Sequence, residues 1–423
     1  MLFRSPNSFF ANWQDVGVVV QEEVNWDDKI IATGGVRFDK SSLNGDNTKW
    51  YPFAKASLAV NIANFDFWKI DAISALKLRA AYGQTGNSPG FGAKFTPLND
   101  VLIGGQAGFV PTTANGNPGI KPETANEFEY GADFGFLNNK ITFEATFYNK
   151  KVVDFIDAYS LSPGTGVSSI GAFNVGDLEN TGIELGLGAS VINTSKLTWT
   201  TNLSWWTNQS KITRLIVPEY QVASSGFGDF GTNRIRLGES PSAWYGSPQT
   251  GTIKTRYENS QPDYQMSWRN NFTFLNNFEF SFMFHTSRGN YNSSLNQELT
   301  DEGGTSPDWN DKSADGSTPV GVARQLGQPG TTTRNYVVNA SYIKLREVAL
   351  YYNVPMKSLP TSWGNVIEGI RVGVSGNNLA LWTDYYGYDP EASNFGNRPV
   401  GGGVDLLSFP SSKRMFFHLT VTF

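Results

Sequence analysis

Long segments in which apolar and polar residues alternate one by one constrain the fold of this chain more than any other feature. In NEFEYGADFGF every second residue is apolar, namely Phe128, Tyr130, Ala132, Phe134 and Phe136. The same pattern recurs in KITFEATFYNK, TGIELGLGASV and KLTWTTNLSW. Side chains of a strand point alternately to its two faces, so each segment predicts a β-strand with one apolar and one polar face. These strands are longer than the usual five or six residues or so.

The connections between these segments distinguish a soluble sandwich from a membrane barrel, because both have such strands. Short polar turns are predicted at Asp27-Asp28, Asn138-Asn139, Asn193-Thr194 and Asn276-Asn277. Between them lie long stretches that we expect to be irregular: Thr85 to Lys121, Asp154 to Asp177, Ser210 to Pro262, Gly289 to Ala340 and Thr383 to Ser411. Short turns on one side and long loops on the other are typical of an outer-membrane β-barrel with extracellular loops.

Composition agrees with a barrel and excludes several other classes. Charged residues make up only 17% of the chain and aromatic residues 14%. The net charge of -5 does not favour nucleic-acid binding, and with no Cys there are no disulfides or thiolate sites. No apolar run is long enough for a transmembrane helix, and the first residues do not resemble a signal peptide.

The alternating segments from Val16 to Phe423 predict about thirteen antiparallel strands. The last segment, MFFHLTVTF, ends the chain without a polar tail. We expect its apolar row to face lipid and to act as a signal for the outer-membrane assembly machinery; the row includes Phe417, Leu419, Val421 and Phe423. His418, Thr420 and Thr422 are expected to face the lumen. An odd number of strands that starts outside predicts a barrel portion and not a closed barrel.

Several motifs occur in the order found in one known family. They are GGVRFDKSS, YPFAKASLAV, LKLRAAYGQTGN, NPGIKPETANEFEYGADF, NVGDLENTGIELGL, SYIKLREVALYYNVP and VSGNNLALWTDYYGYDPEAS, followed by the terminal strand. With these motifs the chain resembles the SusC/RagA class of TonB-dependent outer-membrane transporters of Bacteroidota. The resemblance covers nearly the whole chain.

The resemblance implies a barrel of about 22 strands that imports oligosaccharides or peptides. It also implies a SusD-like surface lipoprotein as lid and energy from TonB-ExbB-ExbD. The plug domain, the TonB box, the amino-terminal β-sandwich and about half of the barrel do not appear. We therefore expect residues 1–423 to be the carboxy-terminal portion of such a barrel and not a functional pore by themselves.

Loop residues are the candidates for binding. The aromatic side chains that could stack on sugar rings are Trp244, Trp309, Tyr385 and Tyr386, and the alternative for them is a girdle at the membrane interface. In DYYGYDPEAS, Pro390 fixes the relation between Asp389 and Glu391. These two carboxylates are expected to anchor the loop or to contact the lid protein or substrate.

No catalytic constellation is present, so we expect a protein that is not an enzyme. His285 and His418 are the only histidines, and there is no nucleophile elbow and no P-loop. No cofactor is expected. DKSADG places Asp311, Ser313 and Asp315 at calcium-ligand spacing, but Val322 stands where an EF-hand needs Glu. A loosely held calcium ion in a loop is the alternative to a solvated turn.

The predicted function is TonB-dependent nutrient import across the outer membrane. Two alternatives stay open at this point. A passive porin would need an even number of strands, and a soluble carbohydrate-binding β-protein would bury its apolar rows between two sheets. These residues do not decide between a glycan and a peptide as substrate. They also do not decide whether the chain comes from a split gene, a truncated gene or a fragment.

Overall fold

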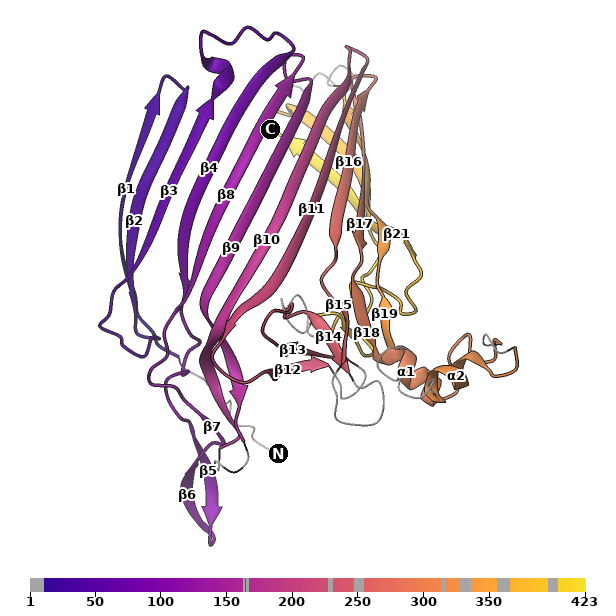
Figure 1. Cartoon of the computed structure of the whole chain (residues 1–423). Coiled ribbons are helices and arrows are strands. Elements are labelled where there is room, and N and C mark those ends of the chain that lie inside the picture. Colours follow the sequence, from indigo (N-terminus) through magenta and orange to yellow (C-terminus); the bar gives the residue numbers. More distant parts are fainter. Residues whose placement is uncertain are drawn as a thin grey trace.

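The computed structural model describes residues 11–162, 164, 167–226, 231–246, 255–312, 316–326, 336–355, 366–394 and 402–423. One large sheet dominates it (Figure 1). The strands along this sheet are β1 (Asp15–Trp26), β2 (Ile30–Ser41), β3 (Tyr51–Asn61), β4 (Ile73–Asn87), β8 (Glu123–Phe136), β9 (Ile141–Ser160), β10 (Ser169–Asn193), β11 (Leu197–Leu215), β16 (Tyr264–Phe274), β17 (Phe278–Arg288), β20 (Tyr342–Val354), β21 (Gly369–Thr383) and β23 (Arg414–Thr422).

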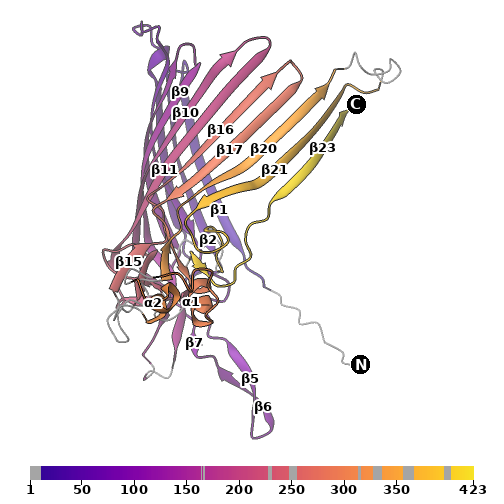
Figure 2. The same ribbon diagram turned by 90° about the vertical axis from the view of Figure 1, so that its right-hand side faces the viewer.

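Each strand of this path pairs antiparallel with the strands before and after it. The predicted antiparallel barrel wall of about thirteen strands is therefore confirmed in the described part of the chain, where thirteen strands follow one another. The short β7 (Ala114–Asn115) pairs in parallel with β10 in addition. Figure 2 shows the sheet bent into an open trough. Among the described residues, β1 pairs only with β2 and β23 only with β21.

The predicted short turns all join neighbouring strands at one end, which we call the short-turn end (Figure 1). Asp27 and Asp28 have φ of 49° and 52°, and Asn138 and Asn139 have φ of 57° and 61°. Asn and Asp tolerate this left-handed backbone better than most residues, which is why they mark tight hairpins. The longer β3–β4 connection, with a 3-10 turn η1 (Ile62–Asn64), also lies at this end, and so do the end of β20 and the start of β21.

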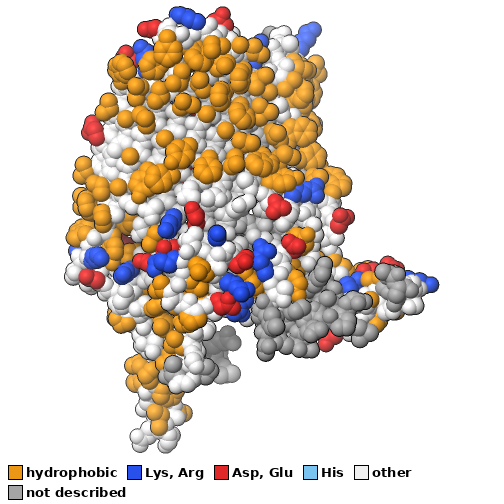
Figure 3. All heavy atoms as spheres, in the orientation of Figure 1, with side chains coloured by type: hydrophobic (Ala, Val, Ile, Leu, Met, Phe, Trp, Pro, Cys, Tyr) orange, Lys and Arg blue, Asp and Glu red, His pale blue; other side chains and the backbone are white. Residues whose placement is uncertain are grey.

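The outer face of the sheet carries a belt of exposed apolar side chains, visible near the short-turn end in Figure 3. Leu78, Phe147 and Ile183 are 40% to 46% exposed and Phe417 is 90% exposed. The opposite face carries paired charges. Arg79 Nε lies 3.0 Å from Asp133, Lys150 lies 3.4 Å from Glu127, and Arg269 lies 3.3 Å from Glu347. An apolar outside and a charged inside are the two surfaces of a transmembrane barrel wall.

The expectation of long irregular loops is wrong at the other end, the long-loop end. Much of 154–177 is strand, because β9 continues to Ser160 and β10 begins at Ser169. Other loops hold small sheets and helices: β5 (Leu98–Ile103), β6 (Gln106–Pro111), β12 (Tyr220–Gly226), β13 (Thr232–Ile235), β14 (Ala243–Gly246), β15 (Thr255–Asn259), β18 (Tyr291–Ser294), α1 (Leu295–Glu302), α2 (Val320–Leu326), β19 (Val337–Asn339) and β22 (Val404–Asp405). These elements are too short to show a periodic pattern.

The buried apolar clusters also lie at the long-loop end. One contains Val175, Ile212, Tyr220 and Ile235, and the other contains Trp244, Leu295, Val337 and Val404. The barrel wall in lipid is one layer thick, so a closed apolar core forms only where loops pack against the ends of wall strands such as β10 and β11. Within the described ranges no helix is long and apolar enough to cross a membrane.

Candidate ligand cavity at the long-loop end

A cavity of about 830 Å³ lies where the wall meets the folded loops, and we call it the loop cavity. The wall contributes residues of β9, β10 and β11, including Phe155, Asn180 and Asn208. The loops contribute residues on either side of β14 and β15 and the segment that begins at Pro390. A volume of several hundred cubic ångströms is that of a site for a small molecule.

The lining of the loop cavity is mostly hydrogen-bonding and uncharged. Amides and hydroxyls come from Asn180, Asn208, Ser210, Ser242, Gln265 and Asn292. Its acidic residues are Glu123, Asp157 and Glu391, and none of the described residues that line it is Lys or Arg. Many neutral hydrogen-bond donors and acceptors around an open space suit a polar, neutral backbone such as a sugar chain or a peptide.

Glu123 and Asp157 are held at one side of the cavity by β8 and β9. Glu123 accepts hydrogen bonds from the amide of Ile156, at 2.6 Å, and from the side chain of Asn87, at 2.9 Å. Asp157 accepts them from the Tyr220 hydroxyl and from the amide of Ala158, both at 2.8 Å. Burial and, to a smaller extent, the charge of Glu123 raise the pKa of Asp157, so the two carboxylates lie close to each other.

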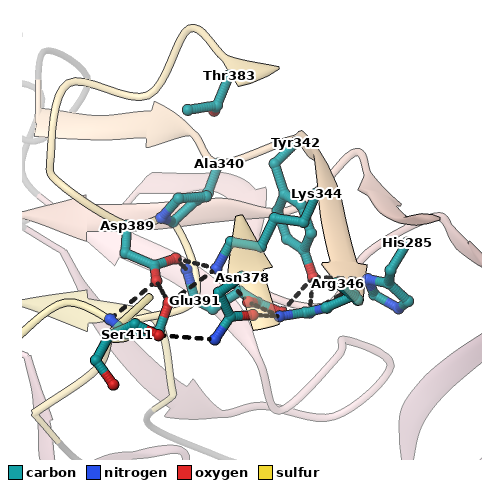
Figure 4. A network of polar contacts seen from close by, with 12 residues as sticks. His285, Ala340, Tyr342, Lys344, Arg346, Asn378, Thr383, Asp389, Glu391 and Ser411 are labelled. Atoms are coloured by element: carbon teal, nitrogen blue, oxygen red, sulfur yellow. Dashed lines mark hydrogen bonds and ion pairs between the residues drawn. The ribbon is translucent and has the colours of Figure 1, made fainter. Parts of the chain in front are cut away.

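The third acid belongs to a charged network that fastens the loop after β21 to β20 (Figure 4). Lys344 Nζ lies 2.7 Å from Asp389 and 2.5 Å from Glu391. Lys344 is 2% and Asp389 3% exposed, so this is a buried ion pair. Glu391 also accepts hydrogen bonds from the Arg346 guanidinium and the Tyr342 hydroxyl. A buried charge is tolerated when it is paired and hydrogen-bonded in this way.

The backbone of the loop is bound to the same carboxylates. Asp389 accepts hydrogen bonds from the amides of Glu391, at 3.0 Å, and of Ser411, at 3.2 Å. Burial raises the pKa of Glu391, but the hydrogen bonds from Arg346, Lys344 and Tyr342 outweigh burial and lower it to about 2. Burial likewise opposes ionisation of Asp389, while Lys344 and Ser411 hold its pKa below the ordinary value. Both groups are therefore charged at neutral pH.

The predicted site residues fall at different places around this network. Asp389 and Glu391 are held together within it, and their contacts are those of a loop anchor; a contact with a lid protein stays a prediction.

Trp244 is fully buried and donates from Nε1 to the Tyr291 carbonyl at 2.8 Å. Tyr385 is 6% exposed and donates to Asp405 at 2.9 Å. In this structure both rings are therefore buried among the loops, and their contact with a ligand stays a prediction.

Tyr386 and Trp309 are half-buried. The Tyr386 hydroxyl lies 2.8 Å from the hydroxyl of Thr300, and the Trp309 ring covers Gly321 so closely that no Cβ would fit there. Neither residue lines the loop cavity. Their role in stacking on a ligand stays a prediction.

The calcium motif is only partly described, because Ser313 and Asp315 lie outside the described residues. Within the described ranges no group of three acidic or histidine side chains is placed to hold a metal ion. Nearby, Arg324 lies 2.6 Å from both Asp301 and Asp308 and pairs with both carboxylates. A cation at these two residues would have to displace a guanidinium.

The terminal strand has the predicted orientation. Phe417, Leu419 and Phe423 are 90%, 69% and 78% exposed, and Val421 of the same row is half-buried. His418 faces the other way, where its Nε2 lies 2.7 Å from the Ser375 hydroxyl. The role of the apolar row in assembly stays a prediction.

Sequence reasoning missed Glu123, Asp157 and the partners of the loop anchor. A signal was present in SYIKLREVALYYNVP, because Lys344 and Arg346 are two residues apart and so share one face of a strand. Their acidic partners are 45 and 47 residues later than Lys344, and no local pattern connects them.

Comparisons with known proteins agree with this architecture. A family model described as "TonB dependent receptor-like, beta-barrel" matches residues 5–236. TonB-dependent receptor P3 of Formosa agariphila is 26% identical, over 99% of this chain and 46% of the relative. TonB-dependent receptor SusC of Bacteroides thetaiotaomicron is 25% identical, over 93% of this chain and 42% of the relative. The chain thus spans about half the length of the curated relatives it matches.

Among solved structures, a chain of the RagAB peptide transporter superposes with a TM-score of 0.81. The two chains are 22% identical, and the match covers 97% of this chain and 48% of the other. The matched half of the RagAB chain has the same fold as the wall and loops described above. The resemblance to the SusC/RagA class is confirmed, and the chain belongs to the TonB-dependent receptor family of outer-membrane β-barrels.

Proposed function

We propose that this chain forms part of the barrel wall and the loop cavity of an outer-membrane importer. This importer takes up oligosaccharides or peptides. The observation that carries the proposal is the loop cavity itself. It opens among amide and hydroxyl side chains on the inner side of a wall whose outer face is apolar. A polar ligand can therefore be held beside the lumen while the wall stays in lipid.

The function is proposed to be binding and passage, without chemistry on the ligand. The relatives are named receptors, and one solved structure is described as a peptide transporter. In this proposal a SusD-like lipoprotein covers the long-loop end and TonB-ExbB-ExbD supplies energy. Asp389 and Glu391 fix the loop that borders the cavity, so they set the rim that such a lid would meet.

Two further partners belong to the proposal. Lipid of the outer membrane surrounds the apolar belt, and the assembly machinery binds the row Phe417, Leu419, Val421 and Phe423. Both assignments are supported by the exposure of these apolar side chains on the outer face.

Uptake by the bacterium that encodes this chain tests the proposal. Deletion of the gene should abolish growth on one class of oligosaccharide or peptide as sole nutrient, and deletion of tonB should have the same effect. Growth that survives loss of TonB but not loss of this gene would instead indicate a passive porin. A purified protein that stays monomeric in water without detergent would indicate a soluble binding protein. Unchanged growth of the gene deletion on all such nutrients would contradict import.

A further inference from the structure

We propose that the loop cavity selects ligands that carry a cationic nitrogen, an amine or a guanidinium, which binds beside Glu123 and Asp157. This inference rests on the proposed function and adds the charge of the ligand to it. Both residues line the cavity. Among the described residues neither has a Lys or Arg nitrogen within 4.0 Å.

The two carboxylates have unused capacity to accept hydrogen bonds. A carboxylate offers about four acceptor positions on its two oxygens. Glu123 is given one protein donor on each oxygen, from Ile156 and Asn87. Asp157 is likewise given one on each oxygen, from Tyr220 and Ala158. All of these donors are uncharged, so they orient the carboxylates without neutralising them.

The other charges near the cavity cancel one another. Glu391 is matched by Arg346 and by Lys344, which also pairs with Asp389. Arg214, on the neighbouring part of β11, lies 2.6 Å from Asp154 and 2.7 Å from Asp177, and Lys151 Nζ lies 3.9 Å from Asp177, so two cations face two carboxylates. Among the described residues that line the cavity, Glu123 and Asp157 are therefore the acidic groups without a basic partner. In a partly enclosed space a fixed charge attracts an opposite charge more strongly than in open water.

The remaining lining does not decide what the cation is attached to. Amides and hydroxyls such as Asn180, Asn208 and Ser242 hydrogen-bond equally well to a peptide backbone and to sugar hydroxyls. A basic peptide and an oligosaccharide of amino sugars offer the same charged group. An acidic peptide or a uronic-acid chain would meet like charge and is expected to be rejected.

Binding of defined probes to the purified chain in detergent tests the inference by calorimetry. One arm compares the pentapeptide Ala-Gly-Arg-Gly-Ala, N-acetylated and C-amidated so that Arg carries its only charge, with the same capped peptide containing Gln or Glu in place of Arg. The other arm compares the glucosamine tetramer with its fully N-acetylated form. In at least one arm the cationic probe should bind about tenfold more tightly than its neutral counterpart, which corresponds to one charge-assisted hydrogen bond. The arm that shows the preference identifies the source of the cation.

The variant Glu123→Gln with Asp157→Asn should lose this preference while its binding of the neutral probe stays within about threefold. Asp100→Asn, on the exposed hairpin of β5 and β6, is the matched control and should keep the preference. Circular dichroism checks that the variants retain the sheet, and the comparison of probes on the unmodified chain needs no variant. Equal affinity for cationic and neutral probes, or a preference that survives in the double variant, would overturn the inference. Neither result would contradict import itself, because import is tested separately by the growth experiment.

Discussion

The buried ion pair between Lys344 and Asp389 holds the loop after β21, and replacing Lys344 tests this role. In Lys344→Met the carboxylate of Asp389, 3% exposed, loses its cation and stays buried. Breaking a buried ion pair from one side costs about 3–5 kcal/mol, so the loop should release from β20. Hydrogen exchange of the Glu391 and Ser411 amides, which both donate to Asp389, should become faster.

The exposed Lys413 provides the control, and Lys413→Met should leave these amides protected. Adding Asp389→Leu to Lys344→Met should restore much of the protection, because an apolar pair replaces the charged one. Unchanged exchange in Lys344→Met would show that the ion pair does not hold the loop.

The pKa of Glu391 predicts the pH range over which the anchor weakens. Its pKa in the folded state is lowered from 4.5 to about 2. A lowered carboxyl pKa means that the stabilisation is complete above about pH 4.5 and is lost as the pH falls towards 2. The exchange rate of the loop amides, corrected for the intrinsic rate, should therefore increase as the pH falls from about 4.5 towards 2. Glu391→Gln should show a smaller change, and an equally large change in that variant would assign the effect to another group.

At the scale of the strand, the two faces of β4 should respond oppositely to charge. Leu78 is 46% exposed on the outer face, whereas Ala81 points inward and is paired in register with Glu129. Leu78→Arg should cost up to about 2–4 kcal/mol in a bilayer, depending on depth, while Ala81→Arg should be tolerated. Urea unfolding from lipid vesicles measures both. Equal losses would mean that the outer face of β4 does not lie in lipid.

The hairpin between β16 and β17 depends on the backbone freedom of Asn276, which has a φ of 64°. A β-branched side chain is strained there by about 1–2 kcal/mol, whereas glycine is not. Asn276→Val should lower the urea midpoint and Asn276→Gly should keep it near that of the unmodified protein. An unchanged midpoint in the valine variant would show that the turn adopts another conformation.

For the whole molecule, the two sheet edges are decisive. Among the described residues β1 and β23 each have one neighbour, and in lipid an unpaired strand edge leaves backbone groups unsatisfied. We therefore expect the chain by itself to form no uniform pore in planar bilayers. Channels of one reproducible conductance from the purified chain would contradict this and would require β1 and β23 to pair.

Much of the wall could be predicted from the sequence because lipid and lumen impose a period of two on every strand. The register of β8 with β9 is one case: Phe128, Tyr130 and Phe134 share the face that NEFEYGADFGF predicts for them. The hairpins at Asp27-Asp28 and Asn138-Asn139 were predictable because few residues accept their positive φ. The loop cavity was not, since its lining comes from segments far apart along the chain.

The sequence by itself therefore determined the sheet, the faces of its strands and the family, because these depend on neighbours one or two residues away. Tertiary structure decided the loops. It placed Trp244 in an apolar cluster, buried Tyr385 against Asp405, and joined Lys344 to Asp389. Among the described residues, it also left Glu123 and Asp157 at the cavity wall without a Lys or Arg partner. Such contacts depend on how distant segments pack, and no local period encodes that packing.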